Sequence, residues 1–128
     1  IYVLSSLSTN PQIKDTENLY KIGCCSGAVS ERIKNASIEP TYLLSDVKIV
    51  LTVRCYNINV FQLEGAIHDF FAKSNVSFEV IDKAGNIHHP KEWFIAPLSI
   101  IEEAIQLIVN DDITKYDYNP EMQLIVKK

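Results

Sequence analysis

The sequence predicts an α/β domain of the mixed α+β kind, in which a small, mainly antiparallel central sheet is flanked by helices. Residues 47–55 (VKIVLTVRC) alternate between apolar and mostly polar side chains, the pattern of a half-buried strand. Residues 58–72 and 97–109 instead place apolar side chains at helical spacing. The chain has 128 residues, of which 47% are apolar, enough for one core. We therefore expect a single domain over residues 1–128.

The first forty residues predict two strands followed by a helix. Residues 1–7 and 19–25 are rich in β-branched and aromatic side chains, which favours strands. The polar segment 8–18 between them contains Asn-Pro and predicts a long loop. A helix is expected over about residues 28–37, where apolar side chains share one face, and Pro40 ends that segment.

The second half predicts a helix, a hairpin, a second helix and an edge strand. The helix over 58–72 carries Glu64 and His68. Residues 77–81 and 93–95 are expected to pair as a hairpin around the turn-forming cluster 83–86. Pro97 suits the first turn of the helix that follows. Residues 122–126 predict a short edge strand.

Cysteine content and hydropathy point to an intracellular protein that does not contact a membrane. Cys24, Cys25 and Cys55 show no C-x-x-C spacing, so neither a disulfide framework nor a zinc site is indicated. A reducing, cytoplasmic setting is expected. No apolar run approaches the roughly 18 residues that a membrane span needs.

The charge balance weighs against binding to a polyanion. The formal net charge is −4, whereas nucleic-acid binding is driven by Lys and Arg. The acidity is uneven, because residues 1–60 carry six basic and five acidic side chains and residues 61–128 carry six and eleven. Most of the acidity therefore lies away from the N-terminal half, which weakens the objection to nucleic-acid binding.

Several short motifs occur in an order that resembles one nuclease family. These are Ile1-Tyr2-Val3, Tyr20-Lys21-Ile22-Gly23, Arg32 in an early helix, Glu64 in a later one, and Glu92-Trp93-Phe94. This order resembles the GIY-YIG endonucleases, in particular the phage-associated branch with an EWF motif. The resemblance covers residues 1 to about 95 and makes 96–128 a C-terminal extension. Two departures are that the Gly of the first motif, if any, would precede Ile1 and that Lys21 stands where a Tyr is usual. The gap from Tyr2 to Lys21 is also longer than usual, and the loop 8–18 accounts for it.

The resemblance implies a metal-dependent endonuclease that hydrolyses phosphodiester bonds in DNA. It places Mg²⁺ or Mn²⁺ on the Glu64 carboxylate, because hard cations prefer oxygen ligands. It places Arg32 on the phosphate, where a planar guanidinium binds two oxygens. Lys34 and Tyr20 are further expected substrate contacts.

The resemblance also makes Tyr2 the general base. A phenol with a pKa near 10 is protonated at neutral pH, so Tyr2 needs a nearby cation. We expect Lys21 to point out of the core beside Tyr2 and to lower its pKa. His68 lies four residues after Glu64 on the same helical face and is expected to assist.

Each of these residues has a simpler structural interpretation. Taken singly, Tyr2 and Tyr20 are better explained as strand aromatics and Glu64 as a surface helix residue, and Arg32 could be a solvated helix residue. The alternative function is a catalytically inactive module that binds nucleic acid or protein. RNA is an alternative substrate, and the segment after Pro97 is an added element or a homodimer contact. A specificity domain is expected elsewhere in a longer protein.

Overall fold

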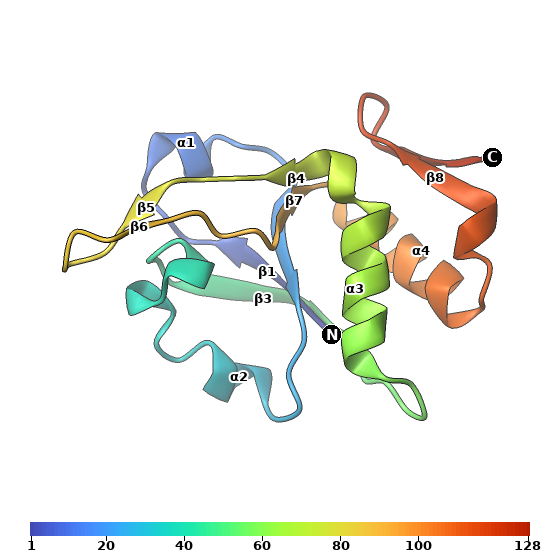
Figure 1. The fold of residues 1–128 in the computed structure, drawn as a ribbon, viewed down its shortest axis with the longest axis horizontal. Coiled ribbons are helices and arrows are strands. Elements are labelled where there is room, and N and C mark those ends of the chain that lie inside the picture. Colours follow the sequence, from blue (N-terminus) through green and yellow to red (C-terminus); the bar gives the residue numbers. More distant parts are fainter.

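A computed structural model describes residues 1–128 and confirms the mixed α+β fold (Figure 1). Its centre is a five-stranded sheet in the order β3-β1-β2-β7-β4. Every neighbouring pair of strands in it is antiparallel. The strands are β1 (Tyr2–Ser6), β2 (Leu19–Gly23), β3 (Val47–Thr52), β4 (Asn75–Val76) and β7 (Trp93–Ile95).

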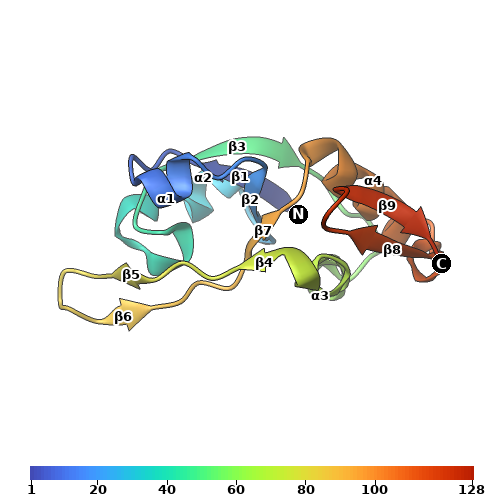
Figure 2. The same cartoon turned by 90° about the horizontal axis from the view of Figure 1, so that it is seen from above.

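Four α-helices lie around this sheet. They are α1 (Pro11–Lys14), α2 (Val29–Arg32), α3 (Val60–Phe70) and α4 (Leu98–Val109). Short 3-10 helices are η1 (Ala36–Ile38), η2 (Pro40–Tyr42), η3 (Ala72–Ser74) and η4 (Ile113–Lys115). In Figures 1 and 2, α3 and α4 lie toward one end of the molecule, and α1 and α2 lie toward the other.

Two further hairpins complete the fold. β5 (Val80–Ile81) pairs with β6 (Ile87–His88), and this hairpin extends away from the body beyond β4 (Figure 2). β8 (Tyr116–Asn119) pairs with β9 (Leu124–Lys127) next to α4. No helix has both the length and the hydropathy required to cross a bilayer.

The two faces of the sheet carry different cores, because side chains alternate along each strand. Val3, Ile22 and Phe94 pack against buried side chains of α3 and α4 in the largest cluster. Tyr2 and Leu4 point the other way and pack with Ala36 and Tyr42 of η1 and η2. The face covered by η1 and η2 therefore differs from the face covered by α3 and α4.

The predicted strand over 47–55 is shorter, and its alternation is interrupted. The register shifts so that Val3 pairs with Leu51 and Leu4 with Ile49, which leaves Val50 as an extra residue. Val50 and Leu51 both pack against the largest cluster, and Ile49 is 39% exposed. Because of the bulge, Val50 faces the core and Ile49 faces solvent, which is the reverse of what strict alternation predicts.

Three other predictions of local structure need correction. The expected loop 8–18 contains α1, which Asn10 caps by accepting a hydrogen bond from the Gln12 backbone. The helix expected over 28–37 ends at Arg32 and is followed by η1. The hairpin between 77–81 and 93–95 is wrong, because β5 pairs with β6 and β7 pairs with β2 and β4.

A tight turn explains why β5 pairs with β6 and not with β7. The Asp82 carboxylate accepts hydrogen bonds from the backbones of Ala84 and Asn86, and Gly85 has a φ of 85°. Such a turn closes a local hairpin and leaves β7 free to pair within the central sheet.

Candidate functional site

Tyr2 is buried on the η1–η2 face of the sheet and lies directly over Gly23. The strand register pairs these two residues, and the exposed fraction of Tyr2 is 2%. A Cβ on residue 23 would lie 2.6 Å from both Cζ and Oη of the Tyr2 ring. Glycine at position 23 is therefore what allows the ring to occupy this place.

Lys21 shares this face, as the strand alternation predicts, but it does not reach solvent. Its side chain is fully buried, and Nζ lies 5.8 Å from the ring centre of Tyr2 and 5.3 Å from that of Tyr42. The ammonium forms an ion pair with Glu92. The expectation that Lys21 points out of the core is wrong, because η2 brings Tyr42 over it.

The pKa of Tyr2 moves in the direction opposite to the one expected. Burial raises the pKa, and a hydrogen bond with Tyr42 raises it further. Arg32 lowers the pKa by a smaller amount, and the negative charge of Glu92 opposes it. The ammonium of Lys21 is paired with Glu92 and is not among the groups that shift the pKa of Tyr2. Tyr2 is a protonated phenol in this site.

Arg32 is held in place at the end of α2 by Tyr42 and Glu39. Its Cζ lies 5.3 Å from the ring centre of Tyr42, and the Tyr42 hydroxyl donates a hydrogen bond of 3.4 Å to the Arg32 carbonyl. One guanidinium nitrogen lies 3.6 Å from the Glu39 carboxylate. Because the Arg32 side chain is 41% exposed, its guanidinium is accessible to an anion in solution.

Glu64 and His68 lie one turn apart on α3, beside the end of β2. The pKa of the Cys24 thiol is raised to about 12. Burial is the largest cause, and the neighbouring Glu64 carboxylate is the second. The His68 Nε2 lies 2.7 Å from the carbonyl oxygen of Ile22, and the ring packs 5.0 Å from that of Phe94. His68 therefore fixes α3 against the sheet, and Glu64 is positioned with it.

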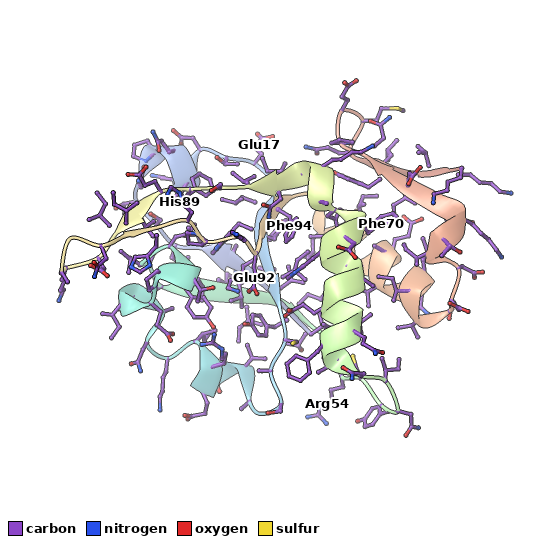
Figure 3. The ribbon with its side chains drawn as sticks, viewed as in Figure 1. Glu17, Arg54, Phe70, His89, Glu92 and Phe94 are labelled. Atoms are coloured by element: carbon purple, nitrogen blue, oxygen red, sulfur yellow. The ribbon has the colours of Figure 1, made fainter.

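Glu92 directly precedes β7, lies near the middle of the molecule (Figure 3) and is paired with Lys21. Burial is the main cause of the raised pKa of Tyr2, Tyr42 and Cys24, and the negative charge of Glu92 adds a smaller contribution to each. It also raises the pKa of Arg32. Glu92 and Tyr42 were not among the residues expected in the site. The signal for Glu92 was a carboxylate directly before a buried strand.

Lys34 and Tyr20, the other residues expected to contact the substrate, lie apart from this group. Lys34 lies at the surface, where Nζ is 3.2 Å from the Glu31 carboxylate and the side chain is 62% exposed. Tyr20 packs against the largest apolar cluster, on the face opposite Lys21. Tyr20 is therefore not brought together with Arg32, because neighbouring residues in a strand face opposite ways.

The site offers few protein ligands for a divalent cation. No group of three or more His, Cys, Asp or Glu residues is arranged to hold a metal ion. The adjacent residues His88 and His89 do not form a metal site with other ligands, and the His88 Nε2 lies 2.8 Å from the Asp82 carboxylate. Mg²⁺ is commonly held by one or two carboxylates together with waters and substrate phosphates. Glu64 fits such a site as a single carboxylate ligand.

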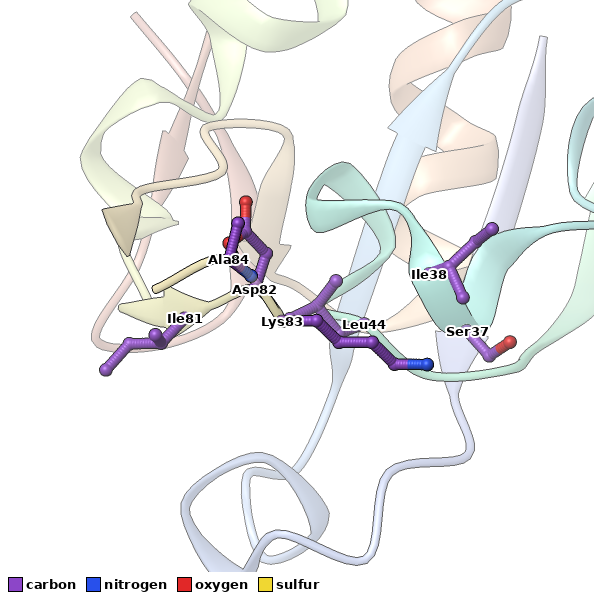
Figure 4. A pocket seen from close by; sticks show the side chains of 7 residues that line it. All are labelled: Ser37, Ile38, Leu44, Ile81, Asp82, Lys83 and Ala84. Atoms are coloured by element: carbon purple, nitrogen blue, oxygen red, sulfur yellow. Dashed lines mark hydrogen bonds between the residues drawn. The ribbon is translucent and has the colours of Figure 1, made fainter. Parts of the chain in front are cut away.

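A separate hollow of about 360 Å³ lies between η1 and the β5–β6 hairpin (Figure 4). Its lining includes Ile38, Leu44 and Ile81. None of the residues gathered around Glu92 contributes to it. This hollow is therefore distinct from the site described above.

The fold is that of a small mixed α+β domain with a cluster of polar side chains beside its central sheet. Sequence comparison identifies its family. Residues 1–109 match the T5orf172 domain. The chain belongs to this family, whose domains are nuclease-like or DNA-binding. No match to any solved structure was found.

The chain is also similar to the uncharacterized protein YeeC of Bacillus subtilis (strain 168). The two are 44% identical over 109 residues, which cover 85% of this chain. The same region is 28% of YeeC, so the chain spans little more than a quarter of that relative.

The family match corrects the resemblance to GIY-YIG endonucleases, because T5orf172 is a different family. The motif residues have a local explanation in packing. Tyr2 needs Gly23 opposite it, and Lys21 occupies the next position on the same face. Motifs of two to four residues in adjacent strands report this packing and do not identify a family.

Proposed function

We propose that this domain is a metal-dependent endonuclease that hydrolyses phosphodiester bonds in DNA. The observation that carries the proposal is that two groups of side chains lie against the end of β2. Tyr2 lies over Gly23, with Lys21 beside it and Arg32 against the neighbouring Tyr42 ring. His68, one turn from Glu64 on α3, contacts the Ile22 carbonyl oxygen. A cation-binding carboxylate and a phosphate-binding guanidinium are the two functions that phosphodiester hydrolysis requires.

Arg32 is assigned to the phosphate. Its contact with Glu39 is long and half-exposed, so phosphate oxygens can replace that carboxylate. The Tyr42 ring holds the guanidinium plane while this exchange takes place. Two parallel N–H···O bonds from a fixed guanidinium then neutralise charge that develops on the phosphoryl oxygens.

Glu64 is assigned to the cation and Tyr2 to the orientation of the nucleophile. A bound Mg²⁺ or Mn²⁺ would polarise the phosphate and stabilise the leaving oxygen. With its raised pKa, Tyr2 acts as a hydrogen-bond donor and not as a free phenolate base. Lys21 and Glu92 together hold the Tyr2 ring at the site, and His68 holds α3.

Cleavage of DNA with a matched pair of variants tests this proposal. Supercoiled plasmid and branched DNA are incubated with the protein and Mg²⁺ or Mn²⁺, with EDTA as the metal-free control. Glu64→Gln should reduce cleavage by at least about 100-fold, the effect of removing a group that stabilises the transition state. Glu103→Gln, an exposed change on α4, should leave cleavage unchanged. Equal activity of the two variants would remove Glu64 from the mechanism.

A second candidate is a DNA-binding module that does not cut. The specific observations that favour it are the net charge of −4 and the carboxylate partners of both Lys21 and Arg32. Binding without cleavage under every metal condition would support this candidate. The same assay with single-stranded RNA distinguishes DNA from RNA. Sequence specificity would then come from other parts of a longer protein, and any homodimer contact from the segment after Pro97.

A further inference from the structure

A second hollow, of about 430 Å³, lies at the end of the central sheet. The segment that follows β3 forms one wall, with Arg54, Cys55 and Tyr56. The segment between β2 and α2 forms another, with Ser26 and Gly27. Its size lies in the range of pockets that bind small ligands.

This hollow adjoins β2 and α3, two elements that carry the proposed site. Cys25 lines it, two residues after the end of β2. Val60 also lines it and lies four residues before Glu64, on the same face of α3. A molecule in the hollow at Val60 is therefore about one turn of α3 from the proposed metal-binding carboxylate.

The walls combine an exposed aromatic ring with an unpaired cation. The Tyr56 side chain is 73% exposed, although it is a large aromatic residue. Arg54 is exposed and forms no ion pair, in contrast to Arg32 and Lys21. A partner that suits both groups has a flat apolar ring next to a negative charge. A nucleotide has this combination.

We propose that this hollow receives one unpaired nucleotide of the DNA substrate beside the phosphodiester bond to be cut. Its base stacks on Tyr56 and its phosphate contacts Arg54. The inference rests on the proposed endonuclease function and narrows the substrate class. DNA with a bulge, a flap or a single-stranded segment presents such a base directly, whereas a continuous duplex must first extrude one at a cost in free energy.

Binding is measured without cleavage, in EDTA, by fluorescence anisotropy. The probes are a duplex with a single unpaired 2-aminopurine and a fully paired duplex of otherwise the same sequence. The bulged duplex should bind more tightly, and the 2-aminopurine emission should change as the base enters the hollow. Tyr56→Ala should weaken binding of the bulged duplex by roughly 5- to 100-fold, whereas Tyr56→Phe should retain it. Arg54→Ala should weaken binding and reduce its salt dependence.

Two matched controls lie outside the hollow. Phe61 is 70% exposed on α3 but does not line the hollow, so Phe61→Ala should leave the preference for the bulged duplex intact. Lys48→Ala removes an exposed cation from β3 and should leave that preference intact as well. Circular dichroism checks that each variant is folded.

The outcomes separate this inference from the proposed function. Equal binding of both duplexes, or no effect of Tyr56→Ala, would overturn the nucleotide site even if the protein cuts DNA. A preference for the bulged duplex that depends on Tyr56, in a protein that never cuts, would support the site and refute the endonuclease. Loss of a dimer on Tyr56→Ala, seen by analytical ultracentrifugation with DNA binding unchanged, would instead show an interface between two copies.

Discussion

The ring of Tyr2 lies across the backbone of Gly23, the residue paired with it in the neighbouring strand. An added Cβ at position 23 would lie 2.6 Å from two atoms of that side chain. Tyr2 is buried and contacts the Lys21 ammonium, so it has little room to move away. This packing couples the stability of the sheet to the geometry of the site.

Gly23→Ala should therefore destabilise the protein by about 1–3 kcal/mol, the usual effect of overpacking a buried position. Urea denaturation followed by circular dichroism measures this change. Gly65→Ala is the control, because residue 65 lies within α3 and a Cβ there meets nothing within 4 Å. That change should stabilise the protein by about 0.4–1 kcal/mol. A neutral effect of Gly23→Ala would show that Tyr2 relaxes freely.

Glu92→Gln should destabilise the protein because it leaves the buried Lys21 ammonium without its counter-charge. Loss of one partner of a fully buried pair costs about 3–5 kcal/mol, but Glu92 is 38% exposed. Screening by solvent reduces the expected loss to about 1–2 kcal/mol. Denaturation of Glu92→Gln, Lys21→Met and the double variant gives the coupling between them. Additive effects would mean that the two charges do not interact.

The Cys24 thiol should react slowly with iodoacetamide at pH 8, since its pKa is about 12 and the thiolate is the reactive form. Glu64→Gln removes the negative charge beside the thiol, so the pKa should fall and alkylation should become faster. Mass spectrometry of peptides follows Cys24 separately from Cys25 and Cys55. An alkylation rate at Cys24 that is unchanged by Glu64→Gln would contradict the contact between these two residues.

The Asp82 carboxyl should titrate with a pKa of about 2, well below its ordinary value of 3.8. The hydrogen bond with His88 is the largest cause, followed by the backbone of Asn86. Because the folded-state pKa is depressed, the stabilising effect is present above pH 4 and is lost as the pH falls through about 2. NMR titration of the Asp82 side chain measures this. An unshifted midpoint would mean that the hairpin turn is open in solution.

Arg32→Lys keeps the positive charge but loses both the planar fork and its stacking on Tyr42. If Arg32 binds the phosphate, DNA cleavage should fall by at least about tenfold in kcat/KM, an effect of at least about 1.4 kcal/mol. Lys48→Ala, on exposed β3, is the control for loss of charge and should have a smaller effect. Full activity of Arg32→Lys would assign Arg32 a purely electrostatic role.

Local patterns in the sequence were sufficient for much of the fold. The apolar spacing of 58–72 and 97–109 predicted α3 and α4, which run over Val60–Phe70 and Leu98–Val109. Predictions failed where a turn or a bulge controlled the pairing. The Asp82 turn redirected β5 to β6, and the extra residue Val50 shifted the face of β3. The spacing of apolar residues predicts neither the turn nor the bulge, because both depend on hydrogen bonds between neighbouring segments.

The sequence by itself determined that Lys21 and Gly23 share one face of a strand and that Glu64 and His68 lie one turn apart on a helix. Only the tertiary structure decided that Lys21 is buried between two tyrosines and neutralised by Glu92, 71 residues later in the chain. It likewise decided that the pKa of Tyr2 rises. Burial and electrostatic contact depend on which distant segments meet, and alternation along a single strand carries no information about that.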